Sequence, residues 1–229
     1  IDAYIVSNAD MIPEMISKGI PKNTIFDIGI PIDPKFLTEY DRKETLAEIQ
    51  FSTDKTTILI MGGSLGMGKI EYIYEELLGL ENDIQIIVIT GNNKKLYYEL
   101  MKYQNISTKG KKTYIIGFTD KVNKYMQASD LLLTKPGGLT ITEALICKIP
   151  IGVFSPIPGQ EEKNTEFLVK HNLAVDLSHG NSTKETIENL LSDPNNLLAM
   201  KENCSKFSKP FVGRDIYNLI LKLIKTNQA

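Results

Sequence analysis

Two glycine-rich corners carry the residues best suited to hold a phosphate. The first, Gly62-Gly-Ser-Leu-Gly-Met-Gly-Lys69, follows the apolar run Thr57 to Met61. The second, Lys135-Pro-Gly-Gly138, follows Leu131 to Thr134. Glycines let the backbone adopt positive φ and come close to a ligand, and free N–H groups at a helix start attract anions. The pattern indicates a diphosphate held by backbone amides, and the alternative is a tight strand-to-helix turn without a ligand.

Glu143 follows the second corner, and the sequence allows two interpretations of its role. Thr140-x-x-Glu143 spells a capping box, in which the glutamate only caps the helix start. In the other reading, the carboxylate lies on the first helical turn and accepts hydrogen bonds from a ribose diol in the same crevice. Thr140 and Thr142 are open to the same two interpretations.

A stiff polar loop, Ser155 to Asn164, follows the apolar run Ile151 to Phe154. Two prolines and a glycine restrict its backbone, and Gln160, Glu161 and Asn164 offer donors and acceptors that suit sugar hydroxyls. A purely structural loop is the alternative.

Two other nucleotide sites compete for the first corner. Gly63-x-x-x-x-Gly68-Lys69 nearly spells a P-loop, but Ile70 stands where a Ser or Thr hydroxyl should reach magnesium. A dinucleotide site needs an acidic residue at the end of the second strand, which here ends Ile89-Thr90-Gly91. The P-loop and the dinucleotide site are both weakened as interpretations, although a P-loop phosphotransferase stays open as an alternative.

Composition describes an ordinary globular chain. Its 229 residues are 42% hydrophobic and 24% charged, which is enough apolar material for a core. The net charge of −2 gives no overall reason to bind nucleic acid, although residues 94 to 124 hold eight lysines against Glu99 and Asp120. That stretch is a solvated surface or a basic rim near an anionic ligand or lipid. Cys147 and Cys204 are too few for a disulfide framework and fit a reducing cytoplasm.

The elements that position these residues follow from hydrophobic patterning. Strand-length apolar runs alternate with helical patterns, which predicts an α/β fold with a Rossmann-like, doubly wound parallel sheet. The predicted strands are Tyr4 to Ser7, Thr24 to Ile28, Thr57 to Met61, Gln85 to Thr90, Thr113 to Ile116, Leu131 to Thr134, Ile151 to Phe154 and Ala174 to Asp176. The predicted helices lie near Asp10 to Lys18, Ile70 to Leu78, Lys94 to Tyr103, Val122 to Ala128, Thr140 to Cys147, Glu161 to His171, Thr183 to Leu191 and Asp215 to Lys225.

No apolar run approaches the roughly 20 residues that cross a bilayer, so we expect a soluble chain. It opens at Ile1 directly into a strand-like pattern, which suggests a piece of something longer. Gly29 to Pro34, with two prolines and a glycine, is the best linker candidate.

Three motifs in this order, Met61 to Gly66, Thr134 to Ala144 and Pro156 to Asn164, resemble one family. They look like the carboxyl-terminal domain of the monogalactosyldiacylglycerol synthases and bacterial processive diacylglycerol glucosyltransferases, which are GT-B glycosyltransferases of family 28. More distant kin transfer N-acetylglucosamine to the peptidoglycan lipid precursor. The resemblance covers about residues 1 to 205, and the three motifs together are quite specific.

The resemblance implies a UDP-sugar as donor substrate, with no cofactor and no metal, bound mainly by this domain. It places Gly63, Ser64, Gly137, Gly138 and Thr140 at the diphosphate, Glu143 at the ribose, Gly117, Phe118 and Thr119 at the uracil, and Gln160, Glu161 and Asn164 at the sugar. In relatives, the glycine that follows this domain's second strand is often itself followed by an arginine. Here Asn92 and Asn93 follow Gly91, so a charge contact in that corner is in doubt.

The implied reaction is an inverting transfer of a hexose, glucose or galactose, to diacylglycerol or a related lipid. The lipid acceptor and the general base belong to an amino-terminal half that this chain lacks, so no catalytic residue is assigned and the fragment alone should be inactive. The sequence has no Asp-x-Asp motif, which favours charge stabilisation without a metal. A nucleotide-binding or regulatory module and a UDP-sugar epimerase are the remaining alternatives.

The resemblance also implies a domain plan. Residues 1 to 38 would be the tail of the amino-terminal acceptor domain and the linker, residues 39 to 205 the nucleotide-sugar-binding domain, and residues 206 to 229 a helix that packs back on the amino-terminal domain. In the full-length enzyme, which would lie at the cytoplasmic face of a membrane as a peripheral protein, the partners would be a UDP-sugar, a lipid acceptor and the membrane surface, with no nucleic acid.

Overall fold

The computed structural model describes residues 1–62, 69–104, 108–178 and 182–226 of the chain. These residues form two compact units. Unit 1 comprises Ile1–Pro34 and Lys209–Ala229, and unit 2 comprises Lys35–Ser208. The chain therefore passes from one unit to the other twice, between residues 34 and 35 and between residues 208 and 209.

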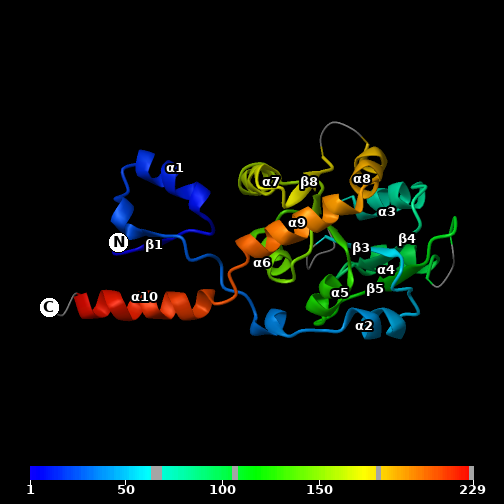
Figure 1. The fold of residues 1–229 in the computed structure, drawn as a ribbon, viewed down its shortest axis with the longest axis horizontal. Coiled ribbons are helices and arrows are strands. Elements are labelled where there is room, and N and C mark those ends of the chain that lie inside the picture. Colours follow the sequence, from blue (N-terminus) through cyan, green and yellow to red (C-terminus); the bar gives the residue numbers. More distant parts are fainter. Residues whose placement is uncertain (63–68, 105–107, 179–181, 227–229) are drawn as a thin grey trace. The chain divides into compact units, whose positions relative to one another are not determined.

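Unit 2 is built on a six-stranded sheet in the order β5-β4-β3-β6-β7-β8, in which every neighbouring pair is parallel (Figure 1). The strands are β3 (Thr56–Met61), β4 (Ile84–Ile89), β5 (Thr113–Ile116), β6 (Leu131–Thr134), β7 (Ile151–Val153) and β8 (Ala174–Asp176). Central strands such as β4 are buried along their whole length, as in sheets covered by helices on both faces. The predicted α/β fold with a doubly wound parallel sheet is confirmed.

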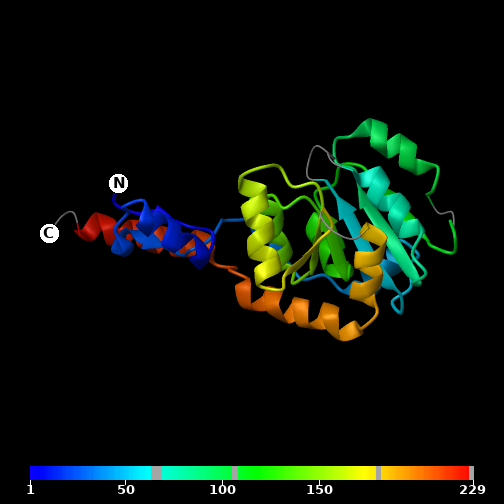
Figure 2. The ribbon, with the colours of Figure 1, turned by 90° about the horizontal axis from the view of Figure 1, so that it is seen from above.

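Helices lie before, between and after the strands and cover both faces of the sheet (Figure 2). They are α2 (Arg42–Glu48), α3 (Ile70–Leu78), α4 (Lys94–Met101), α5 (Val122–Ala128), α6 (Gly138–Ile146), α7 (Gln160–Lys170), α8 (Thr183–Leu191) and α9 (Pro194–Phe207). Successive strand residues point to opposite faces, so Ile58 and Ile60 pack on the side of α3 while Leu59 faces the other layer. All three side chains are fully buried.

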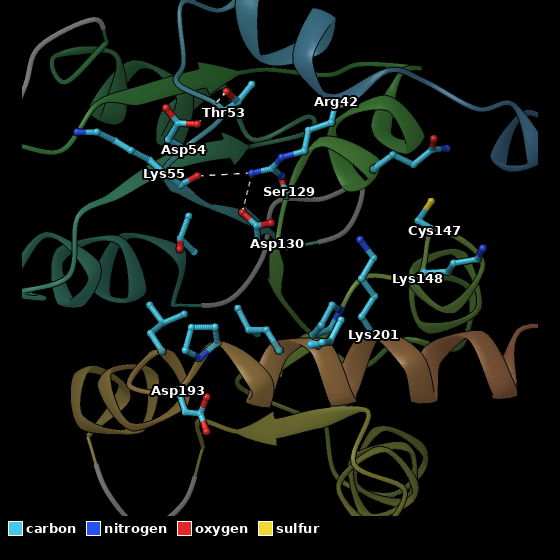
Figure 3. A pocket seen from close by; sticks show the side chains of 17 residues that line it. Arg42, Thr53, Asp54, Lys55, Ser129, Asp130, Cys147, Lys148, Asp193 and Lys201 are labelled. Atoms are coloured by element: carbon cyan, nitrogen blue, oxygen red, sulfur yellow. Dashed lines mark hydrogen bonds and ion pairs between the residues drawn. The ribbon is translucent and has the colours of Figure 1, made fainter.

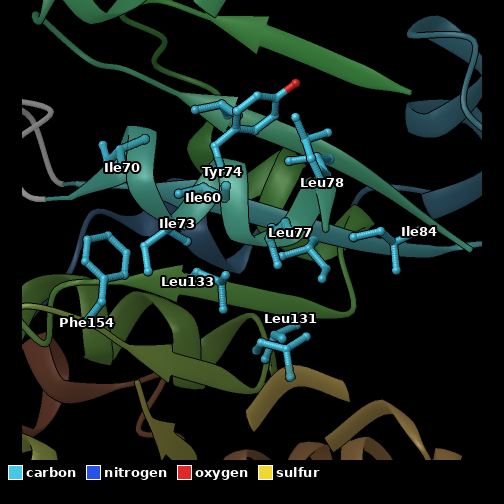
Figure 4. Close-up of a cluster of buried hydrophobic side chains, with 14 of the residues drawn as sticks. Ile60, Ile70, Ile73, Tyr74, Leu77, Leu78, Ile84, Leu131, Leu133 and Phe154 are labelled. Atoms are coloured by element: carbon cyan, nitrogen blue, oxygen red, sulfur yellow. The ribbon is translucent and has the colours of Figure 1, made fainter. Parts of the chain in front are cut away.

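The core beneath α3 holds the carboxyl edge of the sheet in place. Ile73 and Leu77 of α3 lie over Ile60 and Leu133 (Figure 4). Each such buried aliphatic side chain contributes about 1.5–3 kcal/mol through removal of apolar surface from water. The buried hydroxyl of Tyr74 is hydrogen-bonded to Thr113 Oγ1 at 2.9 Å, so its polar end is satisfied inside this core. The result is a rigid platform from which the loops at the strand ends project.

Unit 1 is small and has only a two-stranded sheet. Its strands and α-helices are β1 (Tyr4–Ile5), α1 (Ile12–Ser17), β2 (Ile25–Phe26) and α10 (Val212–Thr226), and two short 3-10 helices, Ala9–Met11 and Lys22–Thr24, lie between them. Strand β1 pairs with β2 in parallel, and Lys209 forms an ion pair with Asp27 that ties the two segments of the unit together. Val6 and Val212 are buried. That this unit belongs to an acceptor-binding half stays a prediction.

No helix among the described residues is long and apolar enough to span a membrane.

Candidate functional site

The ends of five parallel strands lie level with one another, and this alignment creates the site. The register pairs Met61 of β3 with Ile89 of β4 on one side and with Thr134 of β6 on the other. Ile116 of β5 and Val153 of β7 continue the same row. The loops after these strands therefore leave the sheet at one edge. From β3 the chain adds β4 and β5 on one side, and it then crosses back to add β6, β7 and β8 on the other side of β3. This edge therefore contains the topological switch point where ligands of open α/β sheets bind.

Helix α6 begins at this switch point with backbone donors that no described residue satisfies. Gly137 is its N-cap and has no side chain that could satisfy the first amides of the helix. Within the described part of the chain, no acceptor is recorded for the backbone N–H groups of Gly138, Leu139 or Thr140. These N–H groups and the helix dipole together attract an anion. Thr142 Oγ1 donates to the Gly138 carbonyl at 2.9 Å, which is a bond internal to the helix.

The polar loop after β7 lies against this helix start. Asn164 Nδ2 on α7 donates to the Pro136 carbonyl at 2.8 Å. Glu161 Oε2 accepts from the Ile157 amide at 2.8 Å, and its Oε1 would lie 3.9 Å from a Cβ atom added to Gly137. The structure thus brings the second glycine corner and the polar loop together. Gln160, the first residue of α7, is exposed at the same edge.

The loop Gly117-Phe-Thr119 continues from β5 and contacts α4. A Cβ atom on Gly117 would meet the Tyr97 ring at 3.7 Å, so the ring lies directly over this backbone. Phe118 is 69% exposed, and Thr119 Oγ1 accepts from the Lys121 amide at 3.1 Å. The loop presents backbone groups and one exposed aromatic ring on the far side of β3 from α6.

The capping-box reading of Glu143 is wrong. Because the helix begins at Gly138 with Gly137 as its N-cap, Thr140 is the third helical residue and caps nothing. The expectation that Glu143 lies on the first helical turn is also wrong, since it falls in the second. It shares a face of α6 with Cys147, one turn further on, and that face is turned toward Gln127 of α5. Helix α5 follows the Gly117–Thr119 loop, so the half-buried Glu143 lies on the side of α6 nearest that loop.

Burial is the main cause that raises the pKa of the Cys147 thiol to about 12, and the neighbouring Glu143 carboxylate raises it further. Cys147 is therefore a neutral thiol at physiological pH and no candidate nucleophile.

Gly63 and Ser64, the predicted diphosphate contacts of the first corner, lie outside the described residues. The residues on either side are described. Gly62 is buried at the end of β3, and α3 starts at Ile70. Ile70 is fully buried in the core, so its side chain is turned away from the strand edge. A P-loop would need a hydroxyl there, and this placement weakens that alternative further.

Thr134 is a feature of the site that sequence reasoning missed. Its hydroxyl is fully buried at the end of β6, next to Met61, and it is the one buried side-chain polar atom without a hydrogen-bond partner among the described residues. Buried polar atoms are normally paired, so an unpaired one at a candidate site is informative. No sequence signal distinguishes it from the paired threonines of other strands, because partners are fixed only by the fold.

Two pockets help to define the location of the site. A pocket of about 250 Å³ lies at the carboxyl edge and includes Lys69, Ser155 and Glu162. A second pocket, of about 360 Å³, lies near the opposite ends of β3 and β6 (Figure 3). There Arg42 is bonded to Asp130 at 2.9 Å. None of the predicted site residues lines the second pocket. Among the described residues, no group of three or more His, Cys, Asp or Glu side chains could hold a metal ion.

The chain matches the model of the glycosyltransferase family 28 C-terminal domain over residues 57–212. This match includes the first and second glycine corners, the loop after β5 and the polar loop after β7.

Relatives with related sequences carry a common name. The chain is 29% identical over 204 residues to a processive diacylglycerol beta-glucosyltransferase of Bacillus pumilus, covering 89% of this chain and 52% of the relative. It is 30% identical over 223 residues to one of Staphylococcus saprophyticus, covering 95% of this chain and 56% of the relative. The chain thus spans about half the length of the curated relatives it matches.

Solved structures share the fold at low sequence identity. MurG of Acinetobacter baumannii matches with a TM-score of 0.64 and 20% identity, over 97% of this chain and 74% of that one. A putative UDP-N-acetylglucosamine 2-epimerase of Listeria monocytogenes matches with a TM-score of 0.70 and 16% identity, over 98% and 60%. Anabaena HepE in complex with UDP matches with a TM-score of 0.63 and 15% identity, over 96% and 64%. At these identities the likeness shows the fold alone.

Proposed function

This chain belongs to glycosyltransferase family 28, and from that premise we propose that it is the donor-binding half of an enzyme that transfers glucose from UDP-glucose to diacylglycerol or a related lipid. The observation that carries the proposal is the uncapped start of α6, placed at the switch point beside the end of β3. The sugar and the acceptor are taken from the shared name of the curated relatives. Galactose is the alternative hexose.

The diphosphate would bind at the start of α6. The amides of Gly138 and Thr140 supply preorganised donors. Gly63 and Ser64 of the first corner, which lie outside the described residues, are proposed as further diphosphate contacts on the resemblance alone. Negative charge grows on the diphosphate as the sugar leaves, so donors already aimed at it stabilise the transition state more than the ground state. This is how a binding half contributes to catalysis without supplying a base.

The nucleoside would extend from α6 toward β5. Glu143, on the face of α6 turned to α5, would accept hydrogen bonds from the ribose hydroxyls. The backbone of Gly117, Phe118 and Thr119 would then hold the edge of the uracil, with Tyr97 supporting the loop from behind. This arrangement supports the prediction that a whole nucleotide spans the switch point.

The hexose would lie on the other side of the diphosphate, against the polar loop. The Glu161 carboxylate lies near Gly137 and is held by the Ile157 amide, so it is positioned before ligand binds. A carboxylate so close to a diphosphate would repel it, whereas sugar hydroxyls would donate to it. Gln160 and Asn164 add further polar groups at the start of α7.

This chain spans about half the length of its relatives. The general base and the lipid acceptor site would belong to the other half of the enzyme. We therefore assign no catalytic base here. By itself the chain should bind donor and complete no transfer. Mixing the complete enzyme with UDP-glucose and diacylglycerol, and identifying the glycolipid formed, separates glycosyl transfer from epimerisation of the donor.

Calorimetric titration of the chain with UDP, ATP and NAD tests donor binding. We expect UDP to bind without added metal and ATP to bind only weakly. Magnesium-dependent ATP binding with UDP silent would instead support a phosphotransferase.

Substitution of Glu143 tests the ribose contact. Glu143→Ala should weaken UDP binding by about 1–3 kcal/mol, the usual size for hydrogen bonds to a charged acceptor. Glu202→Ala, an exposed glutamate on α9, is the matched control and should leave the affinity unchanged. An unchanged affinity in a folded Glu143→Ala variant would remove Glu143 from the site.

A further inference from the structure

The lysine-rich stretch between residues 94 and 124 divides into two groups in the structure. Three of its lysines are used internally. Lys111 is buried and donates to the Leu80 carbonyl at 2.6 Å, Lys112 donates to the Gln50 carbonyl, and Lys124 forms an ion pair with Glu48. Lys112 stays exposed despite this bond, and the other five lysines, Lys94, Lys95, Lys102, Lys109 and Lys121, are exposed as well. Three of the exposed lysines, Lys94, Lys95 and Lys102, belong to α4 or cap its end.

Helix α4 presents a basic face with a tyrosine at its centre. Leu96 and Leu100 are its buried residues, four apart, and they fix which side faces the core. At 100° per residue, the opposite side carries Tyr98 with Lys94 one turn before it and Lys102 one turn after. Tyr98 is 72% exposed. Lys95 borders the same face and pairs only loosely with Glu99, at 3.8 Å. We call this surface, Lys94, Lys95, Tyr98 and Lys102, the α4 face.

The α4 face is anchored to the sheet edge and to the candidate site. Helix α4 packs on β5, which is the edge strand (Figure 1). The Tyr98 ring meets the Tyr97 ring edge-on with centroids 5.4 Å apart, and the Tyr97 ring covers Gly117. The exposed tyrosine is therefore a fixed projection of the fold rather than the end of a loose loop.

We propose that the α4 face is a surface that docks on an anionic lipid bilayer. Lysines extend their ammonium groups to lipid phosphates while their methylene stems stay near apolar groups, and tyrosine partitions into the membrane interface. Charge complementarity selects an anionic surface, since Lys94 and Lys102 flank the ring on both sides. The Lys102 ammonium also lies over the Tyr103 ring, 4.9 Å from its centroid. The proposal rests on the proposed function, because the acceptor named for the relatives is a membrane lipid.

A bilayer fits this surface better than a nucleic acid does. Nucleic-acid-binding domains usually have a strongly basic isoelectric point, whereas that of this chain is about 5.8 and its net charge is −2. A planar membrane can contact the α4 face alone, with an exposed aromatic ring entering the interface.

Vesicle sedimentation tests the proposal with the 229-residue chain. We expect binding to vesicles of phosphatidylcholine with phosphatidylglycerol and little binding to phosphatidylcholine alone. Since each lysine near an anionic surface is worth about fivefold in partitioning, Lys94→Gln with Lys102→Gln should lower binding roughly 25-fold. Tyr98→Ser should weaken binding further at unchanged charge. The control pair Lys148→Gln, in the turn after α6, and Lys201→Gln, on α9, makes the same change in net charge and should leave binding unchanged.

The outcomes distinguish a membrane-binding α4 face from an effect of net charge and from a nucleic-acid surface. Equal losses in the α4 and control pairs would overturn the proposal, because net charge and not the α4 face would then control binding. Tight binding of duplex DNA by the same lysines, with anionic vesicles not bound, would overturn it in favour of a nucleic-acid surface. UDP affinity of the variants, measured in parallel, distinguishes the two proposals. If UDP fails to bind while vesicle binding still depends on Lys94 and Lys102, the donor-site proposal is wrong and the membrane-surface proposal stands.

Discussion

The buried hydroxyl of Thr134 has no hydrogen-bond partner among the described residues. Its contribution to the stability of the fold can therefore be tested by substitution. Replacing it with an isosteric apolar group removes no hydrogen bond. Because an unpaired buried hydroxyl carries a desolvation cost, Thr134→Val should leave the free energy of unfolding, measured with urea, unchanged or raise it by up to about 1–3 kcal/mol. Thr113→Val is the matched control, since it deletes the bond to the Tyr74 hydroxyl and should cost about 1–2 kcal/mol. Equal losses in both variants would show that Thr134 is hydrogen-bonded in solution.

The two cysteines predict a loss of stability at alkaline pH. Burial raises the pKa of both Cys147 and Cys204 to about 12, from an ordinary value of 9.0. The folded state thus favours the neutral thiols, and their contribution is complete below pH 9 and declines as the pH rises toward 12. Urea unfolding at pH 8 and pH 10.5 should show this decline. The double variant Cys147→Ala/Cys204→Ala should lose less stability between these two pH values, and an identical loss would contradict the assignment.

Residue patterns alone could not decide the role of Glu143. Thr140 and Glu143 have the spacing of a capping box, but Pro136 and Gly137 already turn the chain into a helix that starts at Gly138. A helix start is ambiguous by a few residues when several candidate caps follow one another, and packing decides among them. The same patterns correctly placed the glycine corner at the end of a buried strand.

At the scale of secondary-structure elements, the packing of β7 between its neighbours depends on a glycine. A Cβ atom on Gly152 would lie 2.5 Å from Leu133 Cδ2 and 3.1 Å from Leu177 Cδ1. Gly152→Ala should therefore force side-chain shifts and cost about 1–3 kcal/mol of stability in urea unfolding. Gly213 in α10 has nothing within 4 Å of its Cβ position, so Gly213→Ala should stabilise that helix by up to about 1 kcal/mol. Destabilisation of similar size in both variants would contradict the packing argument.

The strands were predictable from the sequence, but two helices were not. Runs such as Gln85 to Thr90 are mostly apolar because helices cover both faces of the sheet. A short run of this kind is typical of a buried parallel strand. Helix α2 is short and is held by tertiary contacts, with Arg42 bonded to Asp130. Helix α9 buries little besides Met200 and Cys204, so its periodicity is weak. Asp193 followed by Pro194, an N-cap and first-turn pair, was the available signal for α9.

At the scale of the whole molecule, every described residue of the proposed donor site belongs to unit 2. A chain of residues 35–208 should therefore bind UDP with an affinity within about twofold of the 229-residue chain, because no contact is removed. Calorimetry measures the affinity, and circular dichroism checks that the shortened chain is folded. A folded shortened chain that no longer binds UDP would place part of the site in unit 1.

The central claim is that the backbone amides at the start of α6 hold the diphosphate of UDP. Backbone amide resonances of the isotopically labelled chain, followed by NMR during titration with UDP, test it most directly. We predict large shifts for Gly138, Leu139 and Thr140 with UDP and small ones with uridine, which lacks the phosphates. If UDP binds while these three amides do not shift, or if uridine shifts them equally, the account is contradicted.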